Sequence, residues 1–162
     1  MTEDARFEDG TTGLPLRLRA FDGEDLAVIS SLLQDAVMPS GEMTWLPKER
    51  RFAMLVNRFR WEQFAKSGKC ERVQALLIVN DVLRVCSNGF DAGAKDLVLS
   101  LLALRFEPVE DGTGRLVLTL AGDGEIALDV ECLDIALKDV SRPYPAPSGK
   151  APAHPLDEGE AL

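Results

Sequence analysis

The fold class is decided by the segment LVLTLAGDGEIALDV, residues 116–130. Leucines alternate along its first arm, and Ile126, Leu128 and Val130 alternate along its second arm. This period of two is typical of half-buried β-strands. Gly122 and Gly124 between the arms tolerate the positive φ angles of a tight turn, so the segment predicts an antiparallel hairpin.

Other β-like segments precede this hairpin. Leu16, Leu18 and Ala20 alternate with Arg17 and Arg19, which predicts a strand with one buried side. Further β-like runs lie at 43–46, 51–61, 72–79, 82–87 and 97–106, and a loop is expected at 62–69. The run 97–106 is apolar on both parities, so its periodicity leaves strand and helix open. Short links between consecutive strands require antiparallel neighbours.

Two helices are expected beside the strands. Asp22 is a suitable N-cap, and apolar residues recur at helical spacing from Leu26 to Val37. The segment 133–140 fits a closing helix, because Leu133, Leu137 and Val140 share one helical face, although its sequence leaves a strand open as well. We therefore predict an α+β fold. Its curled antiparallel sheet has six to seven strands, a helix follows the first strand, and a second helix lies near the C-terminus. This order of elements resembles a pleckstrin-homology-like barrel.

The chain is expected to form one domain between two tails. Residues 1–13 are acidic and lack apolar bulk, which predicts a flexible tail. Residues 14–142 are long enough for one core. Residues 143–162 are rich in proline and alanine and are expected to be disordered.

Composition narrows the classes of partner and the location. The net charge of −9 argues against wrapping of nucleic acid or an anionic membrane. No run reaches the roughly 18–20 apolar residues that a membrane helix needs, and no secretory signal opens the chain. Three cysteines without a CxxC pair favour a reducing compartment. We therefore expect a cytoplasmic protein.

Basic and aromatic residues gather between Glu42 and Arg72. This stretch carries eight positive and four negative charges, a balance of +4, whereas the rest of the chain carries −13. Such asymmetry attracts partners of opposite charge, and arginine and tryptophan often dominate interface energies. The candidate binding residues are Trp45, Arg50, Arg51, Arg58, Arg60 and Trp61. The alternative is a solvated strand whose Arg and Lys stems cover apolar surface.

Catalytic and metal-binding motifs are absent from the sequence. The one histidine, His154, lies in the proline-rich tail, away from packed neighbours that could hold it against a substrate. The glycine pairs precede β-like runs and match no phosphate-binding loop. No catalytic residue, metal site or cofactor is therefore predicted. Gln34 and Asp35 could line a cleft between the first helix and the sheet, although a polar helix face explains them equally well.

Several segments together resemble a known family. They are FDGEDLAVIS at 21–30, QDAV at 34–37, WLPKERRF at 45–52, NRFRWE at 57–62, LLALRFEP at 101–108 and VEC at 130–132. They are similar to an alphaproteobacterial family catalogued as domain of unknown function 2948, and the resemblance covers nearly all of residues 16–144. It implies a bacterial cytoplasmic origin and brings no reaction, cofactor or catalytic residue with it.

Three hypotheses follow from the sequence. The first is a non-enzymatic binding module that engages an acidic protein or a small anionic ligand through the region from Trp45 to Trp61. The second is an enzyme of unfamiliar type that uses carboxylates or arginines in a cleft near Gln34 and Asp35. The third is a homodimer or structural subunit.

Overall fold

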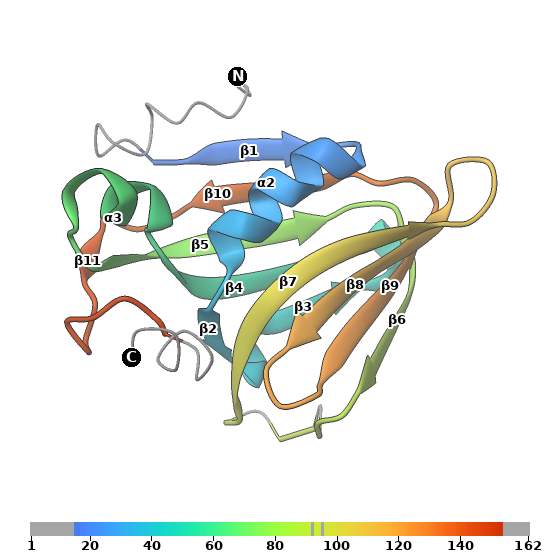
Figure 1. Cartoon of the computed structure of the whole chain (residues 1–162). Helices are drawn as coiled ribbons and strands as arrows, with labels where there is room; N and C mark the ends of the chain where they lie inside the picture. The colour runs from blue at the N-terminus through green and yellow to red at the C-terminus, as the bar shows by residue number, and fades with distance from the viewer. Residues whose placement is uncertain (1–14, 92, 95, 154–162) are drawn as a thin grey trace.

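One antiparallel sheet of 11 strands dominates the computed structural model, which describes residues 15–91, 93–94 and 96–153 (Figure 1). The strands are β1 (Arg17–Ala20), β2 (Ala36–Pro39), β3 (Met43–Leu46), β4 (Arg51–Phe59), β5 (Glu71–Val79), β6 (Val82–Asn88), β7 (Val98–Pro108), β8 (Gly114–Leu120), β9 (Glu125–Val130), β10 (Ile135–Asp139) and β11 (Tyr144–Pro145). The helical elements are α2 (Gly23–Leu33), α3 (Trp61–Ser67) and the short 3-10 turns η1 (Ser40–Glu42) and η2 (Pro47–Glu49).

The strand order is β1-β10-β5-β4-β2-β7-β8-β9-β6, with β11 beside β5 and β3 beside β4. The predicted α+β class and antiparallel sheet are confirmed. The predicted number of six to seven strands is wrong, because short strands such as β2 and β11 have too few residues to show a period. The sheet is not closed into a barrel, since β1 and β6 stand at its two ends without pairing to each other.

The hairpin that decides the fold class is formed by β8 and β9. Leu118 pairs with Ile126, and Leu116 pairs with Leu128. All four side chains are buried. Gly122 and Asp123 at the turn have φ angles of 82° and 67°, as the sequence predicts for a tight connection.

The first predicted helix is confirmed as α2. The Asp22 side chain accepts a hydrogen bond from the Asp25 amide at 2.9 Å and caps the helix. Leu26, Ile29 and Leu33 are buried on its inner face. The helix ends before the predicted boundary, because Asp35 adopts a φ of 65° and the chain turns into β2.

The predicted C-terminal helix at 133–140 is wrong. Residues Ile135–Asp139 form β10, which lies between β1 and β5. Ile135 and Leu137 are buried while Ala136 and Lys138 are partly exposed, so the segment also carries a period of two. The run 97–106, left open by its sequence, lies largely within strand β7. The loop expected at 62–69 contains most of α3.

The two predicted tails are described only in part. Tyr144 and Pro145, inside the segment expected to be disordered, form β11 and pair with Arg72 and Glu71. Residues 1–13 and 154–162, including His154, lie outside the described residues.

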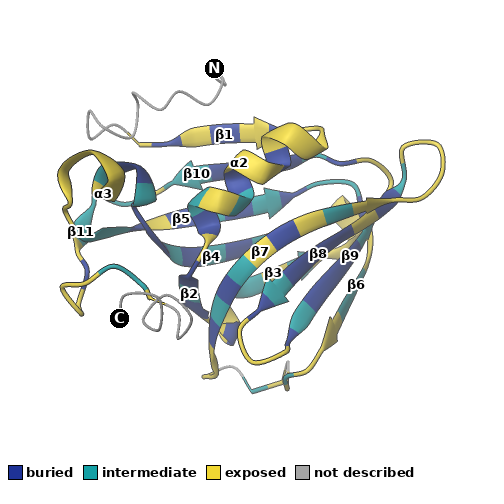
Figure 2. Cartoon of the chain, in the orientation of Figure 1, coloured by how far each residue is buried: buried dark blue, intermediate teal, exposed yellow. Residues whose placement is uncertain are grey.

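The core lies inside the curl of the sheet. Buried side chains from β1, β10, β5 and β4 meet those from β7, β8 and β9 in one hydrophobic cluster, and α2 crosses the opening between them (Figure 1). Buried and exposed residues alternate along β1, so each strand has an inward and an outward side (Figure 2). Among the described residues, no helix has the length and apolar content needed to cross a bilayer.

Candidate binding surface

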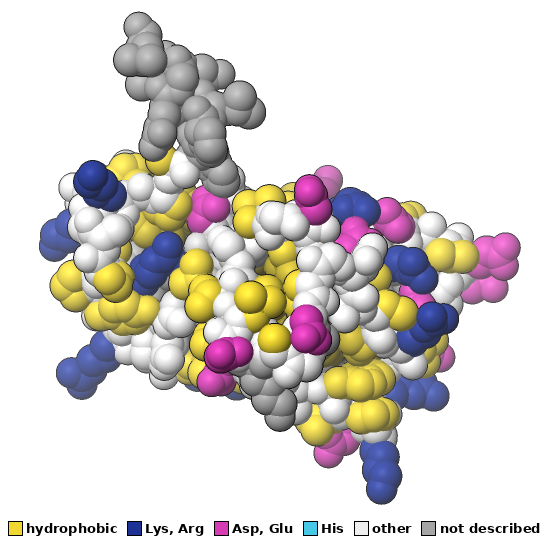
Figure 3. Space-filling view, turned by 90° about the horizontal axis from the view of Figure 1, so that it is seen from below, with side chains coloured by type: hydrophobic (Ala, Val, Ile, Leu, Met, Phe, Trp, Pro, Cys, Tyr) yellow, Lys and Arg dark blue, Asp and Glu magenta, His cyan; other side chains and the backbone are white. Residues whose placement is uncertain are grey.

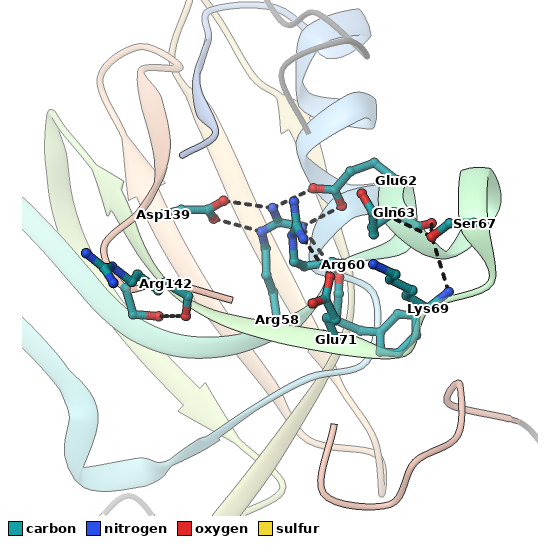
Figure 4. A network of polar contacts seen from close by, with 11 residues as sticks. Arg58, Arg60, Glu62, Gln63, Ser67, Lys69, Glu71, Asp139 and Arg142 are labelled. Carbon is teal, nitrogen blue, oxygen red and sulfur yellow. Dashed lines mark hydrogen bonds and ion pairs between the residues drawn. The ribbon is translucent and has the colours of Figure 1, made fainter. Parts of the chain in front are cut away.

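The Arg58 side chain points into the interior of the protein and away from solvent. It is fully buried. Its Nε and Nη2 donate to Asp139 at 2.9 and 3.0 Å, and its Nη1 and Nη2 donate to Glu62 at 2.9 and 2.8 Å (Figure 4). Burial alone would lower the Arg58 pKa, but the hydrogen bonds and charges of Glu62 and Asp139 outweigh it and hold this pKa above its ordinary value.

Arg60 is also directed inward. Only 4% of it is exposed, and its Nη1 donates to Glu71 Oε1 at 2.8 Å. Arg142 lies nearby, but its side chain points away from Arg58 and Arg60 (Figure 4). The prediction that Arg58 and Arg60 form the centre of an exposed basic surface is therefore wrong, because both side chains are buried and pair with carboxylates there.

The other predicted binding residues are dispersed. Arg50, at the C-cap of η2, pairs with Glu131 at 2.9 Å, while Arg51 Nε donates to Asn80 Oδ1 at 3.2 Å. Trp45 packs partly against the core. Trp61 begins α3, and its Nε1 donates to the carbonyl of Gln34 at 2.8 Å.

The view from below shows no single cationic patch. Lys and Arg side chains lie towards the two ends of this face, with acidic and hydrophobic side chains between them (Figure 3). Along β4, Trp45, Arg50 and Arg51 lie at its start, whereas Arg58, Arg60 and Trp61 lie at its end, so the structure does not bring the six predicted residues together.

Gln34 and Asp35, the residues of the alternative cleft, lie at the end of α2. Gln34 is the C-cap of α2, and Asp35 is buried, with 8% exposed. Their carbonyl oxygens accept hydrogen bonds from Trp61 and Arg72, so both residues fasten the end of α2 to the sheet. One cavity lies beside Arg60 and another lies between α2 and β7, and neither Gln34 nor Asp35 lines them.

A different surface emerges on the outward side of β1, β10, β5 and β4. The register places Arg17 beside Lys138, Lys138 beside Leu76, and Leu76 beside Leu55. A second row places Arg19 beside Ala136, Ala136 beside Ile78, and Ile78 beside Ala53. We call this surface the basic sheet face. It consists of Arg17, Arg19, Arg51, Ala53, Leu55, Asn57, Arg72, Gln74, Leu76, Ile78, Ala136 and Lys138.

The charges of the basic sheet face have one sign. Five of its side chains are cationic: Arg17, Arg19, Arg51, Arg72 and Lys138. None of the outward positions of these four strands holds Asp or Glu. Among the residues that the structure describes, Arg19 is the one of these five that pairs with a carboxylate, that of Asp134 just before β10, at 2.8 Å. Arg17 and Lys138 stand directly opposite each other, an arrangement that costs stability.

The middle of the basic sheet face is apolar. Leu55, Leu76 and Ile78 point outward and are only partly buried. Ala53 and Ala136 extend the same area. An apolar centre with a charged border is the usual arrangement of a protein-binding surface.

The outward side of β7, β8, β9 and β6 is different, and we call it the mixed face. Arg105 pairs with Glu107 at 3.2 Å, and Arg115 pairs with Asp129 at 2.9 Å. Arg84 of β6 stands opposite Asp129 in the register. Cations on this face therefore have acidic neighbours.

Part of this arrangement was visible in the sequence. The alternation of Arg17 and Arg19 with apolar residues indicated a cationic outward side. Lys138 was hidden by the incorrect helix prediction, and Arg72 stood at the boundary of a predicted strand. Among the described residues, no group of three or more His, Cys, Asp or Glu side chains is arranged to hold a metal ion.

Comparison with known proteins identifies one family. The family model described as "Protein of unknown function (DUF2948)" matches residues 16–154. No curated protein matches the chain. No solved structure matches it either.

Proposed function

Because the chain belongs to the family of domain of unknown function 2948, whose description assigns no activity, we propose a function from the structure alone. The protein is a non-enzymatic interaction module. It binds an acidic protein segment through the basic sheet face. The cations of this face contact acidic side chains of the segment, and its leucines contact an apolar stripe on the segment.

One observation carries this proposal. Arg17 and Lys138 lie opposite each other on neighbouring strands, with no acidic residue at any outward position of the four strands. Like charges in this geometry destabilise a sheet. On the mixed face, by contrast, Arg105 and Arg115 have carboxylate partners within 3.2 and 2.9 Å. Since folding gains nothing from the unbalanced charge, an acidic partner is the best account of it.

The same features weigh against other occupants. A second copy of the chain would bring like charges together at a two-fold interface. A membrane would favour exposed apolar side chains, whereas Leu55, Leu76 and Ile78 are partly buried. The net charge of −9 repels nucleic acid everywhere except close to the basic sheet face.

The test uses a designed partner. The probe is a fluorescent helical peptide with a leucine stripe flanked by glutamates, and binding is followed by anisotropy at low and high salt. Wild-type protein should bind this peptide, more weakly at high salt because exposed charges are then screened. A matched peptide with lysine in place of glutamate should not bind.

Two triple variants locate the binding surface. One replaces Arg17, Arg51 and Lys138 by Gln, and the control replaces Arg84, Arg105 and Arg115 of the mixed face by Gln, so the change in net charge is the same. The first variant should lose affinity by about tenfold or more, and the control should retain it. Equal losses in both variants, or binding of the lysine peptide as strong as that of the glutamate peptide, would refute the proposal. Light scattering on the same samples tests the homodimer.

We also propose the location and extent of the module. Cys70, Cys86 and Cys132 are all free thiols, which suits the cytoplasm. The domain begins near residue 14 and extends past the expected boundary at residue 142, because β11 (Tyr144–Pro145) pairs with β5. Limited proteolysis should remove residues 1–13 first and leave the cut product able to bind the glutamate peptide.

A further inference from the structure

Arg72 differs from the other four cations of the basic sheet face. It is partly buried, and its Nη1 donates to the main-chain carbonyls of Asn57 at 2.9 Å and Asp35 at 3.3 Å. No Asp or Glu side chain among the described residues forms an ion pair with it. The guanidinium group is therefore fixed in place by neutral acceptors while its charge lacks a partner at contact distance.

Aromatic residues flank Arg72 on both neighbouring strands. Phe59 of β4 and Tyr144 of β11 are its direct cross-strand neighbours. The Arg72 guanidinium carbon lies 5.9 Å from the centre of the Phe59 ring. The Tyr144 hydroxyl donates to Asn57 Oδ1 at 2.8 Å and ties β11 to β4. The orientation of Arg72 is thus set before any ligand arrives, which reduces the entropy lost on binding.

Burial also affects the charge of Arg72. It lowers the Arg72 pKa, while attraction from Tyr144 and Asp35 partly offsets this effect. The group remains protonated at neutral pH because a free arginine titrates far above that range. A partly desolvated cation interacts more strongly with an anion than a fully hydrated one does.

The bonding pattern leaves a specific edge of the guanidinium group available. Both main-chain acceptors bind Nη1, whereas Nε and Nη2 donate to no described residue. These two nitrogens present parallel N–H groups, the fork that matches the two oxygens of a carboxylate. We propose that Arg72 binds one carboxylate through Nε and Nη2 and so forms the anchoring site of the basic sheet face. The identity of the carboxylate as part of an acidic protein rests on the proposed function.

A carboxylate fits this site better than a phosphate. Arg72 is the only cation in the row formed with Phe59 and Tyr144, and Asp35 already exerts an attraction on it. One arginine with an acidic neighbour suits a single negative charge, whereas a doubly charged phosphate usually requires more than one cation. The carboxylate can come from a Glu or Asp side chain or from a chain terminus.

The test is a titration of isotope-labelled full-length protein followed by the NMR signal of the Arg72 Nε–H group. The probes are N-acetyl-leucine, N-acetyl-glutamate amide, N-acetyl-leucine amide and inorganic phosphate. The first two carry a terminal and a side-chain carboxylate, the third is neutral, and the fourth tests the competing anion. We expect both carboxylates to shift the signal in a saturable way and the neutral amide to leave it unchanged. The carboxylate that binds more tightly indicates whether a chain terminus or an acidic side chain is the preferred ligand.

Variants separate the fork from the charge. Arg72→Lys keeps the charge but loses the two parallel donors, and Arg72→Gln loses both. Each should weaken carboxylate binding by about tenfold or more. Arg84→Gln on the mixed face should not. Backbone NMR spectra establish that each variant is folded, and the lysine variant provides the test should the glutamine variant be unstable.

Several outcomes would overturn the assignment. They are full carboxylate affinity in Arg72→Lys, binding of phosphate tighter than that of either carboxylate, or an equal response to the neutral amide. These results are distinct from failure of the proposed function. If the Arg72 site binds carboxylates while the glutamate peptide ignores the surrounding cations, the proposed function fails alone. If the peptide needs Arg17, Arg51 and Lys138 but not Arg72, only the anchoring site fails.

Discussion

Basic residues on the inward and outward sides of the strands β1, β10, β5 and β4 have opposite surroundings. On the inward side, Arg58 meets both Glu62 and Asp139, and Arg60 meets Glu71. On the outward side, five cations share one face without an acidic residue among them. The chain thus provides carboxylates where an unpaired charge would prevent folding and omits them where water can solvate the charge.

Exposure alone does not account for this difference. The mixed face is exposed as well, yet Arg105 and Arg115 each have a carboxylate partner there. Of these three environments, the basic sheet face is the one whose outward strand positions hold no acidic residue. The comparison therefore separates arginines that maintain the fold from cations that are available to a partner.

Removing an inward cation should have the largest effect on stability. Arg58→Met leaves Glu62 and Asp139 buried without their shared partner, and breaking a buried ion pair in this way costs about 3–5 kcal/mol. We expect the free energy of unfolding in urea to fall by this amount. The remaining folded protein should bind the glutamate peptide as the wild type does, because Arg58 does not reach the basic sheet face.

A matched change on the mixed face provides the control. Arg115→Met removes an exposed ion pair with Asp129, and such pairs contribute about 0–1 kcal/mol. Similar losses of stability in the two variants would show that the interior position of Arg58 has no special energetic role.

A smaller effect is expected at the other end of the same ion pair. Burial by itself raises the Glu62 pKa, but the hydrogen bonds and charge of Arg58 outweigh it, so this pKa lies below its ordinary value. A carboxyl group with a lowered pKa stabilises the folded state above its unfolded pKa of about 4.3. This contribution is lost as the pH falls from there through the folded-state value.

Glu62→Gln isolates this contribution. The variant should be less stable than the wild type at neutral pH, though by less than Arg58→Met, since Asp139 still opposes Arg58. The difference in the free energy of unfolding between the wild type and the variant should shrink as the pH is lowered. Urea unfolding at a series of acidic pH values measures it, and parallel pH profiles would contradict the expectation.

The sequence predicted the elements whose signals are local. The β8–β9 hairpin and α2 carry their own turn, cap and periodicity, so neither depends on distant residues to be recognised. The segment of β10 fits both periods, and its pairing with β1 and β5 decides between them. These partners are far away in the sequence, which is why the helix predicted there was wrong.

The candidate surface was harder to predict than the fold. The parity of β4 could have shown that Arg58 points inward, because Phe52, Met54 and Val56 share its side and are buried. The basic stretch from Glu42 to Arg72 placed residues from both sides of β4 in one group. Arg17, Arg72 and Lys138 come from three distant segments, and only the strand register unites them.

The smallest effect is expected at Lys138, and its sign differs from that of the other predictions. Lys138→Glu replaces the repulsion between Lys138 and Arg17 by an attraction across the β1–β10 pair, which should stabilise the protein by about 0.2–1 kcal/mol. The same change should weaken binding of the glutamate peptide, because it places an acid on the basic sheet face. Urea unfolding and anisotropy on one preparation measure both effects, with Lys138→Gln as the control for loss of the charge alone. A variant that is less stable than the wild type would mean that Lys138 supports the fold, and the distinction between inward structural cations and outward available ones would no longer hold at this position.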